Sequence, residues 1–414
     1  MKIAFYCPGA APLFNPSGVR AFGGAEVRAL TLAKRLSEIG DFDVSLFVSD
    51  AGIPLPKKDA DLQVATIADP HERRRARFRQ YVESTKSFPY LKLQGWSTGL
   101  LLDLTALFST RMLRGRRDPW RQPLAAPFGR QVPDVVCCFG VSNDSYRVIQ
   151  YCHDHQVRSV LFIASDADLS ENYTPDSKQV GSYGDRGDVC YDAIQLASQI
   201  VVQTESQRTS LEKRFGRSST VIRNPLRVDD VDSPKQAGEF ALWIGRTDDV
   251  KNPACCLSLA GKCPDIPFHL VLNNTDSEMF HRMVSLASSN VTIQERANRN
   301  EVAQLFSQSQ VLVNTSAFEG FPNTFLEAAK YSVPIFSLNV DPDGFIERTG
   351  AGMVAQGDLD RLATELRRVW SDTPRLRQMG QAARDYVVEN HDLDKIIEQL
   401  AAILEGVCAG KKVS

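Results

Sequence analysis

The residues best suited to chemistry are two glutamates, Glu319 and Glu327, in the stretch EGFPNTFLE. An apolar run typical of a strand precedes this stretch, and a pattern typical of a helix begins inside it. In open parallel sheets, ligands bind beyond the carboxyl ends of the strands, where a helix start presents unpaired N–H groups. Pro322 suits the first turn of such a helix, so we expect the amides of Asn323 and Thr324 to face an anion such as phosphate.

The two carboxylates fit the hydroxyl pairs of a sugar and a ribose, because a carboxylate can accept hydrogen bonds from two neighbouring hydroxyl groups. With Glu319 in the loop and Glu327 one helical turn beyond Asn323, they would flank a diphosphate bound at the helix start. This arrangement favours a nucleotide-sugar. The alternative is structural, with Glu319 an exposed loop charge and Glu327 a helix residue stabilised by the dipole.

Two further loops follow strand patterns and could bind an anion. In LWIGRTDDVKNP, Gly245 would permit a tight turn, and Arg246 and Lys251 would hold a departing diphosphate without a metal. In AFGGAEVRALTLAKRL, Gly23 and Gly24 precede an amphipathic helix, where a ligand can approach the backbone closely. The alternatives are a solvated loop for the first stretch and a flexible loop before a helix for the second.

The apolar periodicity predicts the strands and helices that position these loops. Short runs rich in Val, Ile and Phe alternate with longer amphipathic runs, which is the pattern of a parallel sheet covered by helices. The expected strands are 2–8, 43–49, 61–68, 134–140, 157–165, 200–204, 219–223, 240–245, 267–274, 291–295, 311–315 and 333–338. We therefore expect an α/β fold of two doubly wound, Rossmann-like units, with a helical C-terminal segment.

The chain is too long for one ordinary core, and the polar, proline-containing stretch NPLRVDDVDSPKQAGE interrupts both periodicities. We expect an acceptor-side domain at 1–225, a hinge at 226–239 and a nucleotide-sugar-binding domain at 240–390. Residues 391–414 are expected to form a C-terminal helix that crosses back to the first domain.

Residues 71–130 interrupt the first unit with a basic insertion. They contain 13 Lys or Arg against four acidic residues, beside aromatic and leucine-rich runs. Each cation near an anionic surface contributes about 1 kcal/mol to docking, so we expect the insertion to face an anionic acceptor or a membrane surface. A solvated insertion or an oligomer contact is the alternative.

Composition narrows the other choices. A net charge of −2 gives no overall field that would attract nucleic acid. Nine scattered cysteines without a C-x-x-C spacing fit neither a disulfide framework nor a zinc site, and they indicate reduced thiols. The chain opens on a strand pattern rather than a leader, and it has no apolar run of about 18 residues. We expect a cytoplasmic protein, with membrane association through the basic insertion as a further expectation.

Four stretches together resemble glycosyltransferase family 4. They are EGFPNTFLE, IGR followed by KNP, the early GGAE, and VVQTESQRTSLEKRFG followed by VIRNP. The similarity covers most of the chain and is strongest from about 200 to 355. It implies a GT-B fold, in which two Rossmann-like domains face each other across a cleft. It also implies a retaining transfer from a nucleotide-sugar donor that needs no metal or other cofactor.

The resemblance implies roles for individual residues. Arg246 and Lys251 would bind the diphosphate, Glu319 would hold hydroxyls of the donor sugar, and Glu327 would hold the ribose. Glycines of the first domain would close over the donor. The full set expected to bind the donor is Gly23, Gly24, Gly245, Arg246, Lys251, Arg296, Glu319, Gly320, Phe321, Asn323, Thr324 and Glu327.

The chain departs from the family pattern at two positions. Many members place a His that contacts the donor sugar just after the strand matching 157–165, where this chain has Ser165. Asp166 and Asp168 are the remaining polar candidates there. Ser332 replaces the usual glycine after a helix, at a small cost in capping. The expected catalytic set is Glu319, Arg246, Lys251 and Asp166.

The base, the sugar, the acceptor and the oligomeric state stay open. We expect transfer of a hexose to a carbohydrate or glycolipid acceptor, in polysaccharide, glycan or glycolipid biosynthesis, with Arg296 and Asn298 near the base. The alternatives are a nucleotide-sugar epimerase or phosphorylase of the same fold, and a silent nucleotide-sugar-binding protein, which Ser165 motivates. A nicotinamide dehydrogenase lacks support because G-x-G-x-x-G does not follow the first strand.

Overall fold

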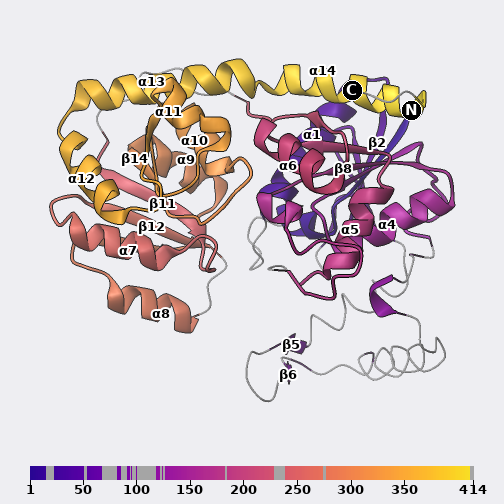
Figure 1. The fold of residues 1–414 in the computed structure, drawn as a ribbon, viewed down its shortest axis with the longest axis horizontal. Coiled ribbons are helices and arrows are strands. Elements are labelled where there is room, and N and C mark those ends of the chain that lie inside the picture. The colour runs from indigo at the N-terminus through magenta and orange to yellow at the C-terminus, as the bar shows by residue number, and fades with distance from the viewer. Residues whose placement is uncertain are drawn as a thin grey trace.

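The computed structural model contains two α/β units joined by two crossings of the chain (Figure 1). It describes residues 1–14, 23–50, 54–67, 82–84, 91–93, 95, 99, 118–121, 124, 126–181, 184–227, 238–273 and 277–410. Most of the basic insertion, and with it the expected docking to an anionic acceptor or membrane, therefore lies outside the described residues.

The first unit is built on an eight-stranded sheet with the order β10-β9-β8-β7-β1-β2-β4-β3. All neighbours are parallel except β3, which runs antiparallel to β4 at the edge. The central strands are buried on both faces, because helices cover both sides of the sheet. The strands are β1 (Lys2–Tyr6), β2 (Asp43–Val48), β3 (Lys58–Asp59), β4 (Leu62–Thr66), β7 (Val135–Phe139), β8 (Arg158–Phe162), β9 (Gln199–Val202) and β10 (Thr220–Val221), with a separate hairpin of β5 (Val82–Ser84) and β6 (Leu91–Leu93).

The second unit is a six-stranded, fully parallel sheet with the order β13-β12-β11-β14-β15-β16. Its strands are β11 (Phe240–Arg246), β12 (Phe268–Asn273), β13 (Val291–Glu295), β14 (Ser309–Asn314), β15 (Ile335–Ser337) and β16 (Gly352–Val354). In a parallel sheet every strand ends at the same edge, so the loops after β11 and β14 are brought to one side of this unit.

Helices connect the strands in both units. In the first unit they are η1 (Pro8–Phe14), α1 (Gly24–Ser37), η2 (Pro119–Arg121), α4 (Asn143–Asp154), η3 (Asp166–Leu169), α5 (Gly187–Leu196) and α6 (Glu205–Phe215). The others are α7 (Pro253–Lys262), α8 (Ser277–Leu286), α9 (Arg299–Gln308), α10 (Asn323–Lys330), η4 (Pro342–Gly344), α11 (Phe345–Thr349), α12 (Leu359–Val369), α13 (Thr373–Asn390) and α14 (Leu393–Cys408). Among the residues that the structure describes, no helix is long and apolar enough to cross a membrane.

Side-chain caps explain why two of the helices nearest the site begin where they do. The Thr204 hydroxyl accepts the amide of Gln207 at the start of α6, at 3.1 Å. Asn252 Oδ1 accepts the amide of Cys255 at 3.2 Å, and Pro253 occupies the first position of α7. Local sequence therefore places the start of α6 just after β9 and the start of α7 after the loop that follows β11.

The doubly wound fold expected from the sequence is confirmed. Each of the twelve predicted strands overlaps an observed one. The strands that the sequence did not indicate, β3, β5, β6 and β16, have only two or three residues, which is too short for an apolar periodicity to be recognised. All nine cysteines are free, and all except Cys255 and Cys408 are buried.

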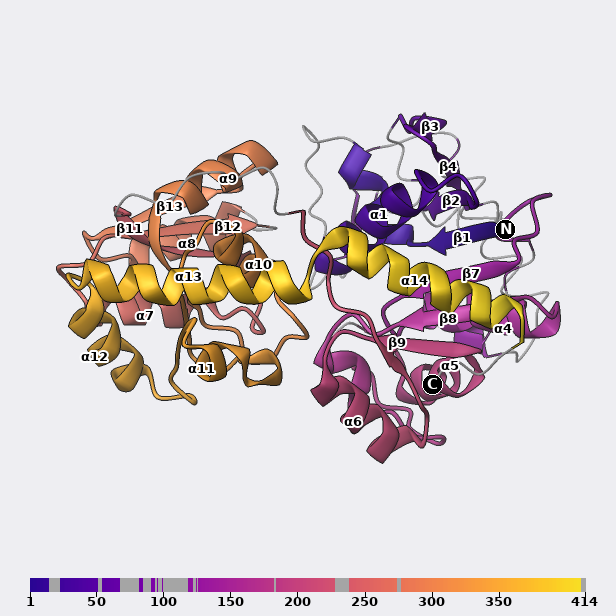
Figure 2. The same cartoon turned by 90° about the horizontal axis from the view of Figure 1, so that it is seen from above.

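The chain passes between the units at 224–226 and again at 391–393. The two crossings are hydrogen-bonded to each other, since the Leu226 amide donates to the His391 carbonyl at 2.7 Å. The Leu393 amide donates to the Leu226 carbonyl at 3.2 Å. After the second crossing, α14 buries its apolar face in the core of the first unit. Figure 2 shows α13 lying over the second unit and α14 over the first.

His391 at the second crossing gives the stability a pH dependence. Its ring is fully buried, with Nδ1 2.7 Å from the carbonyl oxygen of Asn224 and its centroid 4.4 Å from that of Phe321. Burial lowers the pKa of His391 to about 3, against the opposing effect of the Asn224 hydrogen bond. The unfolded chain takes up a proton at about pH 6.5 and the folded chain does not. The contribution of the neutral, buried His391 to the free energy of unfolding is therefore complete above pH 6.5 and is lost as the pH falls towards 3.

We expect the free energy of unfolding of the wild type to fall by about 2 kcal/mol more between pH 7 and pH 5 than that of His391→Gln. Glutamine can still donate to the Asn224 carbonyl, but it does not titrate. Urea unfolding followed by circular dichroism at several pH values measures both proteins. Equal losses of stability over this interval would contradict the assignment.

Candidate active site

The two loops that carry the expected cation and carboxylate meet at the carboxyl edge of the second sheet. Strands β11 and β14 are parallel neighbours, so the loops after them lie side by side. The Lys251 ammonium forms an ion pair with Glu319 Oε1, which also accepts the Ser316 hydroxyl at 2.8 Å. The two charged side chains are only 20% and 15% exposed, so water screens their interaction weakly.

A buried hydroxyl fixes these loops to each other. Thr315 Oγ1 accepts the indole N–H of Trp243 at 2.9 Å and lies 2.9 Å from the carbonyl oxygen of Lys251. Trp243 requires a glycine at Gly245, because a Cβ there would lie 2.7 Å from the indole ring. The expectation of a tight turn at Gly245 is therefore wrong. This glycine lies within β11 and makes room for the tryptophan.

Arg246 ends β11 and is held by a neighbouring carboxylate. Its Nε donates to Asp248 Oδ2 at 2.6 Å, and Asp248 Oδ1 accepts the amide of Lys251 at 3.0 Å. Asp248 therefore shapes the loop between the two cations. The sequence reasoning missed this residue, although the two aspartates that follow Thr247 were an available signal.

Helix α10 begins at the expected place, with Pro322 in extended conformation directly before it. Asn323 and Thr324 form its first turn, so their amides lie at the helix end that favours anions. Glu327 lies further along the same helix and is half-buried. The roles of these residues with phosphate and ribose stay predictions.

Phe321, whose amide was expected to contact the donor, has its ring in the core of the second unit. Its ring is buried and stacks on Phe345 at 5.2 Å. Its amide donates to Gln203 Oε1 of the first unit at 3.0 Å. Gly320 permits this approach, because a Cβ there would lie 3.0 Å from the same oxygen. The Phe321 amide, expected to contact the donor, thus joins the two units.

Two glutamines that the sequence reasoning missed continue this contact into the first unit. Gln203 Nε2 donates to the carbonyl oxygen of Ala164 at 2.7 Å, and the backbone N–H of Gln203 donates to Gln207 Oε1 at 2.9 Å. Gln207 Nε2 donates to Asp166 Oδ1 at 2.9 Å. A chain of hydrogen bonds therefore runs from the loop of Phe321 to Asp166.

Asp166 and Asp168 occupy different environments at the position of the family histidine. Asp166 is reached by solvent, but desolvation within the site and then the charge of Glu319 raise its pKa. Asp168 is buried and accepts the amide of Ala164 at 2.7 Å, and burial raises its pKa to about 7. Asp168 therefore holds the turn, whereas Asp166 is available to a ligand. Ser165 Oγ is buried and makes no hydrogen bond to any described residue.

The early glycines, expected to close over the donor, lie at the start of α1, and Gly24 lies beside α10 of the second unit. The Gly24 carbonyl oxygen is 3.4 Å from Asn323 Nδ2, and a Cβ on Gly24 would lie 3.1 Å from the same atom. The amide of Gly23 donates to Glu26 Oε2 at 2.9 Å, which orders the start of α1. The first unit thus approaches α10 through a residue without a side chain.

Arg296 and Asn298 follow β13, the edge strand next to β12. Arg296 has a left-handed backbone, with φ of 66°, and its guanidinium lies 3.5 Å from Glu295. Asn298 caps α9, since its side chain accepts the amides of Asn300 and Glu301 at 2.9 and 3.1 Å. Its side-chain oxygen is therefore engaged by the helix, which weakens the expectation that it contacts a base.

The second unit also caps a helix of the first. Asp343 in η4 accepts the amides of Glu205 and Ser206, each at 3.0 Å, at the start of α6. Arg223 pairs with the same carboxylate at 3.2 Å. An aspartate at a helix N-terminus is favoured by the helix dipole, and here it also fixes one unit against the other.

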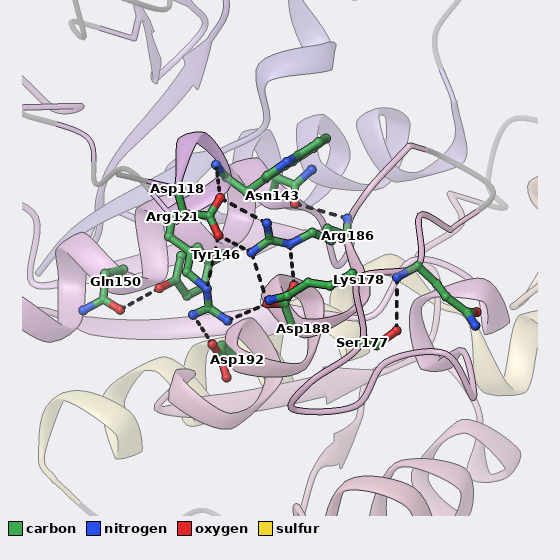
Figure 3. A network of polar contacts seen from close by, with 12 residues as sticks. Asp118, Arg121, Asn143, Tyr146, Gln150, Ser177, Lys178, Arg186, Asp188 and Asp192 are labelled. Carbon is green, nitrogen blue, oxygen red and sulfur yellow. Dashed lines mark hydrogen bonds and ion pairs between the residues drawn. The ribbon is translucent and has the colours of Figure 1, made fainter. Parts of the chain in front are cut away.

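An ion network holds the returning end of the basic insertion against the first unit (Figure 3). Arg186 donates to Asp118 at 3.1 Å and to Asp188 at 2.5 Å. Arg121 and Lys178 also donate to Asp188, at 3.1 and 2.6 Å. Burial raises the pKa of Asp188, but the three cations outweigh it and hold the pKa well below its ordinary value. The network anchors the loop before α5 to the end of the insertion.

Known structures share this architecture over the whole chain. Sucrose-phosphate synthase of Thermosynechococcus elongatus has a TM-score of 0.70 at 13% identity, with 99% of this chain and 100% of that chain covered. HepE of Anabaena, in complex with UDP and glucose, has a TM-score of 0.63 at 15% identity, with 98% and 100% covered. WaaG, a glycosyltransferase involved in lipopolysaccharide biosynthesis, has 0.59 at 14%, with 98% and 100% covered. The fold is therefore GT-B.

The second unit has a more specific relationship. Residues 244–372 match the family described as Glycosyl transferases group 1, and this range contains both loops that join Lys251 to Glu319. An uncharacterized glycosyltransferase of Haemophilus influenzae is 22% identical over 223 residues, which are 52% of this chain and 63% of that relative. The match thus spans less than two thirds of the relative's length. Residues 244–372 of this unit are thus similar to group 1 glycosyltransferases.

Proposed function

We propose that the protein is a retaining glycosyltransferase of family 4 that moves a sugar from a nucleotide diphosphate sugar to an acceptor hydroxyl. The observation that carries this proposal is the ion pair between Lys251 and Glu319. It sets a cation for the departing diphosphate beside a carboxylate for sugar hydroxyls, at the edge of a parallel sheet where ligands bind. In the first unit, Gly24 contacts Asn323 at the start of α10, and Asp166 feels the charge of Glu319, so both residues would border the donor.

In this reaction the bond between the anomeric carbon and the diphosphate breaks, and the acceptor oxygen bonds to the same face of that carbon. The acceptor proton leaves to the departing phosphate oxygen. Arg246 and Lys251 stabilise the negative charge that develops on the diphosphate, helped by the amides that open α10. Electrostatics and positioning supply the acceleration, and no metal or other cofactor is required.

The finer assignments form part of the same proposal. Glu327 holds the ribose, Arg296 lies near the base, and Gly23 and Gly24 close over the donor. A hexose is transferred in the cytoplasm, in polysaccharide, glycan or glycolipid biosynthesis. The structure of HepE contains UDP, which makes uridine the first base to test.

Calorimetry with UDP, GDP and ADP tests the donor site. Release of nucleoside diphosphate from the matching sugar, with and without acceptor sugars, tests transfer. We expect one diphosphate to bind and its release to depend on an acceptor. Interconversion of donor sugars without an acceptor would support the epimerase alternative, and binding without any release would support the silent binding protein. Failure of all three diphosphates to bind would contradict the proposal.

A further inference from the structure

A cavity of about 470 Å³ lies beside the candidate active site. Its walls come from η3 and the turn after it, from residues 180–181, and from α6. Phe318, the residue before Glu319, contributes to the lining from the second unit. The ion network in Figure 3 anchors the loop that contains residues 180–181. The volume falls in the range of small-molecule sites, and the donor assignments above do not use this space.

Neutral polar groups dominate the lining of this cavity. Its hydroxyl and amide side chains are Ser170, Asn172, Tyr173, Ser206, Gln207 and Ser210. The lining also has one cation, Arg214, which donates to the carbonyl oxygen of Leu169 and pairs with Glu171 at 3.1 Å. An anionic ligand would find Arg214 already bound to Leu169 and Glu171. A neutral polyol can instead form hydrogen bonds with the hydroxyl and amide side chains. Tyr173 and Phe318 add aromatic surface for the apolar face of a sugar ring.

Asp166 joins the cavity to the donor loop. It belongs to the cavity lining, and it accepts Gln207 Nε2 at 2.9 Å. Gln207 Oε1 also accepts a hydrogen bond from the backbone N–H of Gln203. Gln203 Oε1 in turn accepts one from the backbone N–H of Phe321. The charge of Glu319 acts on Asp166, second only to desolvation among the causes that raise its pKa. One wall of the cavity and the loop that carries Glu319 are thus hydrogen-bonded together.

We propose that this cavity is the acceptor site and that it binds a neutral carbohydrate, with the attacking hydroxyl directed at Asp166. This inference rests on the proposed function. Asp166 accepts a hydrogen bond from the hydroxyl and orients it towards the sugar held by Glu319, while the proton leaves to the departing phosphate oxygen. A smaller cavity of about 180 Å³, lined by Tyr6, Phe139 and Asp144 among others, is the competing location.

The test uses a substitution on α6 that fills the cavity with a larger side chain. Ser210→Phe places a ring in the cavity, whereas Thr209→Phe, at the neighbouring and exposed position, does not. The acceptor probes are methyl glycosides of glucose, galactose, mannose and N-acetylglucosamine, with glucuronate and glycerol 3-phosphate as anionic probes. We expect neutral probes to stimulate release of nucleoside diphosphate. Ser210→Phe should lower that stimulation at least tenfold, while Thr209→Phe leaves it unchanged and both variants bind the diphosphate like the wild type.

Other results would overturn the inference. Stimulation by the anionic probes alone, or by none of the probes, would contradict a neutral carbohydrate. Equal stimulation in both variants, with its loss in Asp144→Phe instead, would place the acceptor in the smaller cavity. Asn172→Ala, which removes an amide without adding bulk, should raise KM for the acceptor with little change in the diphosphate Kd, and this checks against a folding defect in Ser210→Phe. A wild type that binds no diphosphate would contradict the proposed function itself.

Discussion

Replacing Glu319 with Gln is expected to lower the rate of sugar transfer about 10- to 100-fold, while free nucleoside diphosphate binds at least as well as to the wild type. This carboxylate is assigned to the sugar hydroxyls, and hydrogen bonds to a charged group contribute about 1.5–3 kcal/mol. It is also the partner of Lys251, so its neutralisation leaves more of the lysine charge for the diphosphate. Single-turnover transfer and calorimetry with nucleoside diphosphate measure the two effects separately.

The comparison for this variant is Glu327→Gln in the same motif. A ribose contact is made by the free diphosphate and by the intact donor alike, so both should bind more weakly by about 1.5–3 kcal/mol. Glu347→Gln, an exposed position on α11, serves as the control and should change neither property. If the Glu319 and Glu327 variants behave alike in both assays, the assignment of separate roles is wrong. If both lose only folding stability, the residues are structural.

Replacing Lys251 with Ala is expected to impair both binding and chemistry. The lysine is assigned to the diphosphate, so the nucleoside diphosphate should bind about 10- to 100-fold more weakly. Turnover at saturating donor should fall further, because negative charge grows on the diphosphate as it leaves and Glu319 is left without its cation. Calorimetry and single-turnover kinetics at saturating donor provide the two measurements.

Lys262→Ala is the matched control, since Lys262 ends α7, the helix that follows Lys251, and pairs with Asp360 at the surface. Exposed pairs contribute little, so this variant should bind and turn over like the wild type. A Lys251 variant that retains wild-type affinity for the diphosphate would show that this lysine only supports Glu319. A fall in melting temperature without a kinetic change would show that the ion pair is structural.

Local sequence determined the strands and the two loops that follow β11 and β14. Apolar runs with helix starts after them are short-range patterns, and caps such as Thr204 and Asn252 act within three residues. The strands of a parallel sheet end at one edge, so the pattern predicted both loops at that edge, and the structure adds that β11 and β14 are neighbours and that Lys251 pairs with Glu319. The family resemblance predicted that Gly23 and Gly24 close over the donor, which stays a prediction, and the structure shows Gly24 beside Asn323 at the start of α10.

Only the tertiary structure decided which groups of the first unit complete the site. Gln203 reaches Phe321 across 118 positions of the chain, and Asp343 reaches Glu205 across 138. Gly245 was expected to turn the chain, yet it makes room for Trp243. Glutamine, aspartate and glycine are common at many positions, and no local pattern separates those that meet a partner in another unit. Their roles depend on which buried backbone groups need hydrogen-bond partners and which side chains need room once the fold has assembled. Both are properties of the assembled fold and not of the local sequence.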